Sequence, residues 1–152
     1  MPIKIITVGK KHESWVSEGI ERYQKRLKQP FLIEWVILPS SSLEGQGARL
    51  EESGRILLRL SANAFVILLD ERGKNIDSPA LSKVLSDQLL HSREIVIIIG
   101  GAYGVDESVH RRADFIWSLS GLVFPHQLAR LILTEQIYRS QEIAAGRPYH
   151  HQ

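Results

Sequence analysis

Three loops that follow runs of apolar residues are the strongest candidates for a ligand site. Residues 95–99 form a β-branched run that leads directly into the glycine-rich segment 100–104. The segments 70–74 and 119–126 follow two further short apolar runs. In an open α/β sheet, ligands bind beyond the carboxyl ends of the strands. If these three runs are neighbouring parallel strands, their loops enclose a pocket of backbone groups and apolar side chains.

The glycine spacing in segment 100–104 indicates what such a pocket could hold. Glycine lets the backbone approach a ligand closely. Gly100, Gly101 and Gly104 give the spacing G-G-x-x-G, which differs from the dinucleotide fingerprint G-x-G-x-x-G, and no phosphate-binding lysine follows. The pocket suits a nucleoside with an uncharged or positive tail better than a polyphosphate. A tight turn that binds nothing is the alternative interpretation.

The segment 147–151 combines side chains that contact nucleic acids. Its sequence is Arg-Pro-Tyr-His-His. Aromatic rings stack on unpaired bases, while guanidinium and imidazole groups contact phosphates and base edges. A loosely held terminus is the alternative, because most termini are poorly ordered. We expect no metal site, since no further histidine or carboxylate stands at ligand spacing from the two adjacent histidines.

The elements that must position these residues alternate between strand and helix, which is typical of an α/β fold. Apolar and β-branched runs predict strands at residues 3–8, 31–38, 64–69, 94–99 and 114–119. Helical spacing predicts helices near residues 16–27, 50–60, 78–90, 105–113 and 126–145. The later strands are continuously apolar, so we expect a mostly parallel sheet with flanking helices. We expect one domain, residues 1–152, with the Ser- and Gly-rich segment 40–47 as its most mobile loop.

The predicted helix at residues 126–145 carries apolar side chains on two opposite halves. One half holds Leu128, Leu131, Ile132 and Tyr138, and the other holds Leu133, Ile137 and Ala144. A helix on one face of a sheet needs a single apolar stripe. The second stripe indicates either contact with another subunit or a helix that is buried on several sides. Glu135 and Arg139 stand four residues apart, so they form either an ordinary ion pair or a cation directed into a site.

The composition is that of a soluble globular protein. The 152 residues are 43% hydrophobic, which is enough for one sizeable core. The chain has no cysteine, which excludes disulfides, thiol catalysis and cysteine-based zinc sites. No apolar run reaches the length of a membrane span and no signal-peptide pattern is present, so we expect a cytoplasmic protein.

The charge balance is mildly basic. The chain has 19 Lys and Arg against 17 Asp and Glu, and this net charge of +2 permits an anionic partner without requiring one. A basic cluster lies near the N-terminus, at Lys10, Lys11, Arg22, Lys25, Arg26 and Lys28. This cluster either follows a phosphate backbone or forms a solvated helix face.

Taken together, these motifs resemble the RlmH family, the SPOUT-class methyltransferases that act on bacterial large-subunit rRNA. The similarity lies in VGKKHESWVSEGIERYQKRL, LLDERGK, IIIGGAYG, WSLSGLVFPHQLARLILTEQIYR and RPYHH, in this order along nearly the whole chain. The resemblance implies a SPOUT-type α/β fold with a C-terminal trefoil knot, S-adenosylmethionine as cofactor and a homodimer. The implied reaction is methylation of N3 of a pseudouridine in 23S rRNA on the assembled ribosome.

The resemblance also implies roles for individual residues. The cofactor-binding residues would be Leu69, Gly100, Leu119, Ser120, Gly121, Leu122, Val123 and Phe124. The substrate-binding residues would be His126 and Arg130, and the catalytic residues would be Arg139, Tyr149 and His150. The tail would reach the cofactor pocket of the partner subunit, where Tyr149 contacts the base. A neutral imidazole of His150 would help to remove the N3 proton.

Two segments depart from the family pattern, and two other functions stay open. His151 stands where the family has a basic residue, and segment 40–47 is shorter and less basic than in many relatives. The second function is that of a ribosome- or rRNA-binding factor without catalysis, against which the intact SGLVFPH segment argues. The third is a small nucleotide-binding oxidoreductase on a flavodoxin-like sheet, against which the missing phosphate fingerprint argues.

Overall fold

Strands and helices alternate along the chain, as the sequence predicts. The structure is a computed structural model that describes residues 1–151. Its strands are β1 (Ile3–Val8), β2 (Ile33–Leu38), β3 (Phe65–Lys74), β4 (Ile95–Ile99) and β5 (Phe115–Trp117). Its helices are α1 (Ser14–Gln24), α2 (Gly45–Leu57), α3 (Ser78–Leu90), α4 (Glu107–Arg112) and α5 (His126–Ala144).

The five strands form one sheet in the order β2-β1-β4-β3-β5. Every neighbouring pair is parallel, which confirms the prediction from the continuously apolar strands. The ladder between β3 and β5 is interrupted, because Leu69 and Lys74 both pair with Trp117 and residues 70–73 leave the ladder. The carboxyl ends of β3, β4 and β5 therefore meet at one edge of the sheet. The trefoil knot that the resemblance implies stays a prediction.

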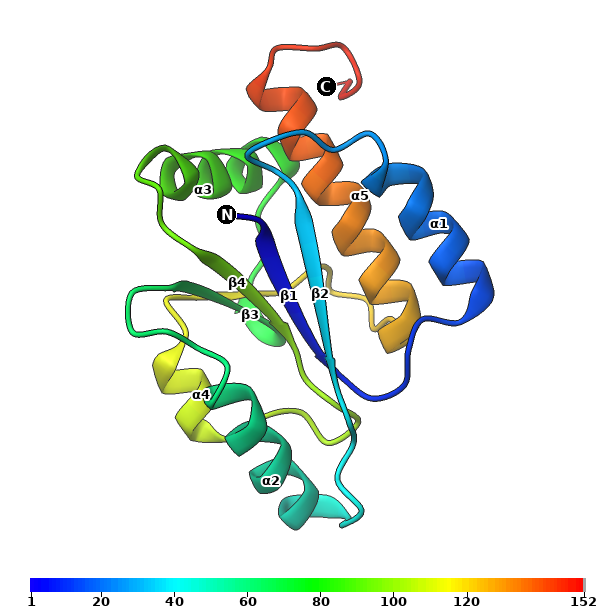
Figure 1. The fold of residues 1–152 in the computed structure, drawn as a ribbon, viewed down its shortest axis with the longest axis vertical. Helices are drawn as coiled ribbons and strands as arrows, with labels where there is room; N and C mark the ends of the chain where they lie inside the picture. The colour runs from blue at the N-terminus through cyan, green and yellow to red at the C-terminus, as the bar shows by residue number, and fades with distance from the viewer. Residues whose placement is uncertain (152) are drawn as a thin grey trace.

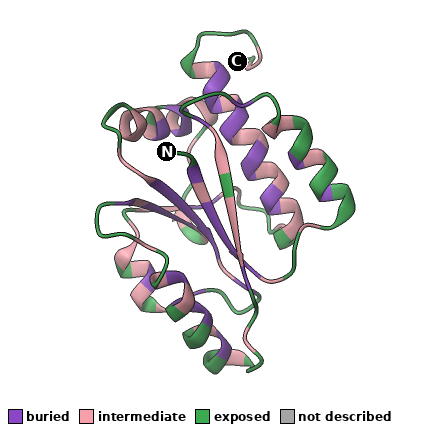
Figure 2. Cartoon of the chain, viewed as in Figure 1, coloured by how far each residue is buried: buried purple, intermediate pink, exposed green. Residues whose placement is uncertain are grey.

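Helices cover both faces of the sheet and enclose two apolar cores (Figure 1). One core packs the strands against α1, α3 and α5, and it contains Ile5 and Ile97. The other core packs them against α2 and α4, and it contains Ile6 and Ile98. Successive strand residues point to opposite faces, so each strand contributes to both cores. Figure 2 shows the largely buried strands β1 and β4, the less buried edge strand β2, and the exposed outer surfaces of α1 and α2.

Helix α2 begins earlier than predicted. It starts at Gly45, so the last three residues of the expected loop 40–47 are helical. Gly45 has a φ of 57°, a conformation that glycine adopts without strain. Ala48 and Ile56 are buried on the inner face of the helix. This packing outweighs the loop-forming composition of the segment, because most helical stability in proteins comes from tertiary contacts.

The two apolar halves of α5 are largely explained within one chain. Leu133 and Ile137 are fully buried in the core. The other side meets α1, where a Cβ atom on Gly19 would lie 2.8 Å from Cδ1 of Leu131. Helix α5 thus lies between α1 and α3 (Figure 1). Ala144, on the same half as Leu133 and Ile137, is exposed because it lies at the end of the helix.

Candidate functional site

A cavity of about 610 Å³ opens at the carboxyl ends of β3, β4 and β5. The residues that the resemblance implies for cofactor binding all line it: Leu69, Gly100, Leu119, Ser120, Gly121, Leu122, Val123 and Phe124. They come from β3, from the turn after β4 and from the segment between β5 and α5. The segment 70–74, predicted as a loop, is instead the last part of β3. The cavity lies at the sheet edge where open α/β folds bind ligands. The structure thus brings this group together in one place.

The glycines after β4 are required by the path of the backbone. A Cβ atom on Gly100 would lie 3.0 Å from Cγ1 of Val105 and 3.3 Å from the carbonyl carbon of Gly104. Gly104 has a φ of 74°, and its N–H donates to the carbonyl of Gly101 at 3.0 Å. The segment is therefore a tight turn that also places backbone atoms in the cavity wall.

Serine side chains hold the loop between β5 and α5. The Ser118 hydroxyl donates to the Ser120 carbonyl at 3.0 Å, and Ser120 Oγ accepts from the Leu122 N–H at 3.0 Å. The Asn75 amide donates to the Ser118 carbonyl at 2.8 Å. Leu122 and Val123 at the cavity rim are 72% and 83% exposed. Adjacent exposed apolar side chains at a cavity are typical of a surface that contacts a ligand or another macromolecule.

Charged residues also lie at the cavity, some of them outside the segments singled out in the sequence. Asp70 Oδ1 accepts from the N–H and Nε of Arg72 at 2.8 and 3.3 Å, and Asp70 Oδ2 lies 3.3 Å from Nε2 of His110. His110 lies outside the segments singled out in the sequence, and its side chain is only 10% exposed. This contact joins distant segments and has no local signal. Arg49 also lines the cavity, and it was missed because α2 was predicted to begin after it.

The two predicted substrate-binding residues lie in different environments. His126 lines the cavity at the first turn of α5. Desolvation by surrounding atoms and the positive charge of Arg130 lower the pKa of His126 from its usual 6.5. Arg130 is 2% exposed, and its Nη1 donates to the carbonyl of Lys10 at 2.8 Å. Arg130 therefore ties the β1–α1 loop to α5, and its contact with a substrate stays a prediction.

The three predicted catalytic residues form one cluster on α5. Tyr149 donates its hydroxyl to Glu135 Oε2 at 2.9 Å, and Arg139 donates to the same oxygen at 2.7 Å. The Arg139 guanidinium lies over the Tyr149 ring at 4.7 Å and 3.0 Å from Nδ1 of His150. Burial and the hydrogen bond to Glu135 raise the pKa of Tyr149. The Glu135 carboxylate, which accepts from both Arg139 and Tyr149, thus holds the tail on α5.

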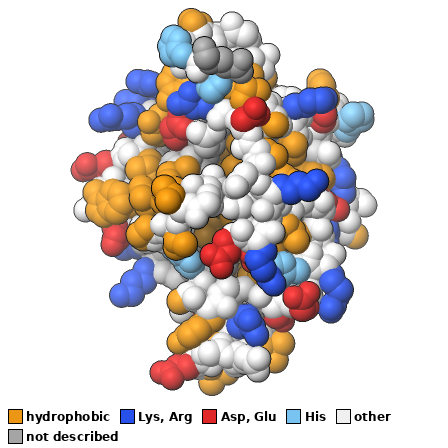
Figure 3. Space-filling model, turned by 180° about the vertical axis from the view of Figure 1, so that it is seen from behind, with side chains coloured by type: hydrophobic (Ala, Val, Ile, Leu, Met, Phe, Trp, Pro, Cys, Tyr) orange, Lys and Arg blue, Asp and Glu red, His pale blue; other side chains and the backbone are white. Residues whose placement is uncertain are grey.

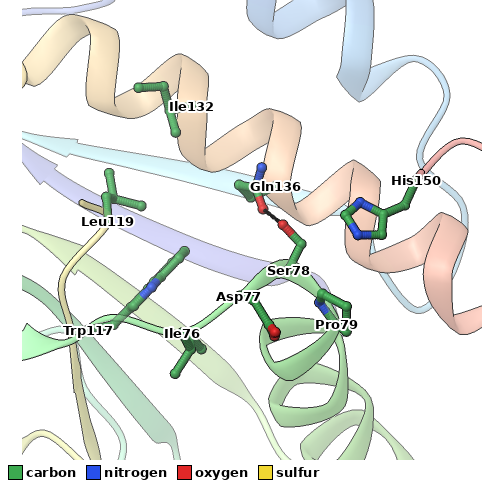
Figure 4. A pocket seen from close by; sticks show the side chains of 9 residues that line it. All are labelled: Ile76, Asp77, Ser78, Pro79, Trp117, Leu119, Ile132, Gln136 and His150. Atoms are coloured by element: carbon green, nitrogen blue, oxygen red, sulfur yellow. Dashed lines mark hydrogen bonds between the residues drawn. The ribbon is translucent and has the colours of Figure 1, made fainter. Parts of the chain in front are cut away.

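This cluster borders a second cavity of about 520 Å³. Figure 4 shows His150 at one end of it, Leu119 and Trp117 at the other, and the Ser78 hydroxyl donating to Gln136 at 2.7 Å. Leu119 lines both cavities. Within one chain, the predicted site therefore divides into two parts that meet at Leu119. The cofactor group is the set of predicted cofactor-binding residues at the first cavity, and the tail group is Arg139, Tyr149 and His150 beside the second.

The molecular surface carries charges of both signs. The six residues of the predicted basic cluster are all exposed. Figure 3 shows Lys and Arg interspersed with Asp and Glu on the face opposite to that of Figure 1, around a gathering of hydrophobic side chains. Within residues 1–151, no three His, Asp or Glu side chains converge to hold a metal ion. None of the described helices has both the length and the apolar character needed to span a bilayer.

A family model described as "Predicted SPOUT methyltransferase" matches residues 1–150. The chain belongs to the SPOUT methyltransferase family. The resemblance noted in the sequence is thereby confirmed. This SPOUT chain is 39% identical over 158 residues to the protein named "Ribosomal RNA large subunit methyltransferase H" of Acetivibrio thermocellus, and 99% of each chain is covered. It is 38% identical over 154 residues to the protein of the same name from Alkalilimnicola ehrlichii, again with 99% of each covered.

Solved structures agree with this assignment at the level of the fold. The chain is similar to a "probable methylase family protein" from Haemophilus influenzae, with a TM-score of 0.58 and 9% sequence identity. The similarity covers 99% of this SPOUT chain and 70% of that one. The parallel sheet with helices on both faces is thus shared with a solved methylase-family structure.

Proposed function

We propose that this SPOUT methyltransferase methylates large-subunit rRNA, with S-adenosylmethionine as the methyl donor. The observation that carries the proposal is that all residues of the cofactor group line one cavity, at the ends of three strands. The name of the two similar methyltransferases, from Acetivibrio thermocellus and Alkalilimnicola ehrlichii, supports rRNA as the substrate. We further propose N3 of a pseudouridine in 23S rRNA of the assembled ribosome as the target, and hence a cytoplasmic enzyme.

The residues of the cavity fit S-adenosylmethionine. The cavity volume of about 610 Å³ lies within the range of roughly 300–1,000 Å³ that is usual for small-molecule sites. Leu69, Leu119, Leu122 and Phe124 supply apolar walls for a nucleoside, while Gly100 offers backbone atoms without a side chain in the way. When bound, the cofactor supplies an electrophilic methyl group on a sulfonium. Transfer of that group is an in-line displacement that depends mainly on alignment.

The tail group is proposed to serve the substrate. Tyr149 contacts the target base, and His150 accepts the proton from N3. Arg139 holds both side chains on α5 through its contacts with Glu135 and His150. Because His150 borders the second cavity, we propose that a homodimer brings the tail of one subunit to the cofactor cavity of the other. The exposed Leu122 and Val123 at the cavity rim support such an apolar contact.

The test is transfer of labelled methyl from S-adenosylmethionine to intact ribosomes from a strain that lacks the modification. Free rRNA is the control substrate, and the His150→Ala variant is the control enzyme. We expect label on one pseudouridine, only with assembled ribosomes, and a strong loss of rate in the variant. Label on another RNA would correct the target. Cofactor binding without any transfer would favour a non-catalytic rRNA-binding factor.

A further inference from the structure

Glu52 of α2 is a buried carboxylate with an unusual environment. Its side chain faces the sheet and is 4% exposed. Oε2 accepts a hydrogen bond from the Ser41 N–H at 2.9 Å. Oε1 is buried and has no hydrogen-bond partner among the described residues. An unpaired buried oxygen of this kind is costly, so its position calls for a physical reason.

The free oxygen of Glu52 faces the turn that follows β4. A Cβ atom on Gly101 would lie 2.5 Å from Oε1 of Glu52 and 3.2 Å from Cγ1 of Val8. The carboxylate thus fills the space that a side chain at position 101 would need. Gly101 is itself buried and lines the cofactor cavity. Glu52 therefore supports the cavity wall from the side that faces α2.

The next residue of α2 supports the other end of the same segment. Ser53 is fully buried, and its Oγ accepts from the Asp106 N–H at 2.9 Å. Asp106 is the N-cap of α4, where its side chain accepts from Ser108. Two adjacent residues of one helix thus contact both ends of the loop between β4 and α4. A rigid helix positions such a loop better than loop–loop contacts do.

We propose that Glu52 is a positioning residue of the cofactor site. Through its volume and its bond to Ser41, it holds the Gly100–Gly101 turn in the conformation that keeps the cavity open. The inference rests on the proposed function, because it assigns the cavity to S-adenosylmethionine. Glu52 itself does not line that cavity, so it acts only through the turn.

The test measures S-adenosylmethionine affinity by calorimetry, well below the melting temperature of each variant. We expect Glu52→Ala to weaken binding about tenfold, the size of effect that loss of one supporting group produces. Glu52→Gln keeps the volume and an acceptor for Ser41, so we expect it to restore affinity to near that of the wild type. Glu51→Gln is the matched control, because Glu51 is exposed and pairs with Arg55. A merely structural role would lower the melting temperature of Glu52→Ala without changing affinity in the folded protein.

A second variant tests the same contact from the turn. Gly101→Ala places a methyl group against Oε1 of Glu52, so we expect it to weaken binding too. In the double variant, Glu52→Ala makes room for that methyl group, and we expect the two losses to be less than additive. Wild-type affinity in both single variants, or strictly additive losses, would overturn the inference. Absence of binding by the wild type would instead overturn the proposed function, and this inference with it.

Discussion

Nη1 of Arg139 lies 3.0 Å from Nδ1 of His150. A guanidinium can only donate, so Nδ1 must accept and the proton of the neutral imidazole is carried by Nε2. The lone pair that would take a proton from substrate is therefore occupied by Arg139 in this arrangement. If His150 acts as the base, the substrate must replace Arg139 at Nδ1. Arg139 thus controls both the tautomer of His150 and the availability of its lone pair.

Removing Arg139 should reduce methyl transfer without affecting cofactor binding. Arg139→Met releases His150 and Tyr149 from α5, so we expect the rate with ribosomes to fall by at least about tenfold. S-adenosylmethionine affinity should stay unchanged, because Arg139 does not line the cofactor cavity. Lys83→Met is the control, since Lys83 forms an exposed ion pair of the same spacing with Asp87. Single-turnover rates together with calorimetry separate the two effects, and a parallel loss of affinity would contradict the assignment.

The pKa values of His126 and His12 should both depend on the positive charge of Arg130. Burial and the coulombic effect of Arg130 lower the pKa of His12, as they do for His126. Arg130→Met should therefore raise both midpoints in an NMR titration, while burial keeps them below 6.5. Lys83→Met removes a distant charge and should leave both midpoints in place. Unchanged midpoints in Arg130→Met would show that Arg130 does not act on these imidazoles.

The same two histidines predict a loss of stability in acid. Because their pKa values are lowered on folding, the unfolded chain takes up protons first as the pH falls through 6.5. The free energy of unfolding contributed by these groups is then reduced below that pH. Urea unfolding at a series of pH values measures the effect. A His12→Gln and His126→Gln double variant should show a weaker dependence on pH in the same window, and an unaltered dependence would count against this origin.

Tyr149 predicts a second pH effect at the alkaline end. Burial and the hydrogen bond to Glu135 raise its pKa above the usual 10.0, so the unfolded tyrosine ionises first and stability falls as the pH rises beyond that value. Ultraviolet titration of phenolate formation reports the midpoint. Glu135→Gln should bring the Tyr149 midpoint down toward 10.0, because the negative charge is removed. The late-ionising component should disappear in Tyr149→Phe, which assigns the signal.

Two identical substitutions should change stability in opposite directions. A Cβ atom on Gly73 would lie 2.5 Å from the carbonyl oxygen of Ile116 and 2.7 Å from the Trp117 nitrogen, and neither backbone atom can move away easily. We expect Gly73→Ala to reduce the free energy of unfolding by about 1–3 kcal/mol. Gly54 of α2 has open space around it, so Gly54→Ala should increase that energy by about 0.5–1 kcal/mol. Equal effects in urea unfolding would contradict the close approach of β3 and β5.

Much of the lining of the cavity proposed for the cofactor could be predicted because its signals are local. Each loop follows an apolar run, and parallel strands bring such loops to one edge of the sheet. The contribution of α2 could not be predicted in the same way, since a Ser- and Gly-rich segment conceals the start of the helix. A usable signal was nevertheless present: Ala48, Glu52 and Ile56 recur at a spacing of four, which puts Glu52 on the buried face.

Other parts of the site depend on contacts between distant segments. Neither the contact of Asp70 with His110 nor the burial of Arg130 follows from neighbouring residues. The division of the site into two cavities also depends on the folded chain, because a tail sequence does not reveal where the tail packs. Family resemblance supplied the residues of both groups, and the structure supplied their separation within one chain.

The bond between Arg130 and Lys10 also bears on how the protein is made. Two further contacts join segments similarly far apart along the chain: the Glu13 N–H donates to Gln127 at 2.9 Å, and the Lys28 N–H donates to Gln141 at 2.7 Å. During synthesis, α1 leaves the ribosome long before α5 has been translated. Its apolar residues Val16 and Ile20 then have no helix to pack against. Native packing of α1 must therefore be a late event of synthesis, and its apolar side chains stay uncovered until α5 has formed.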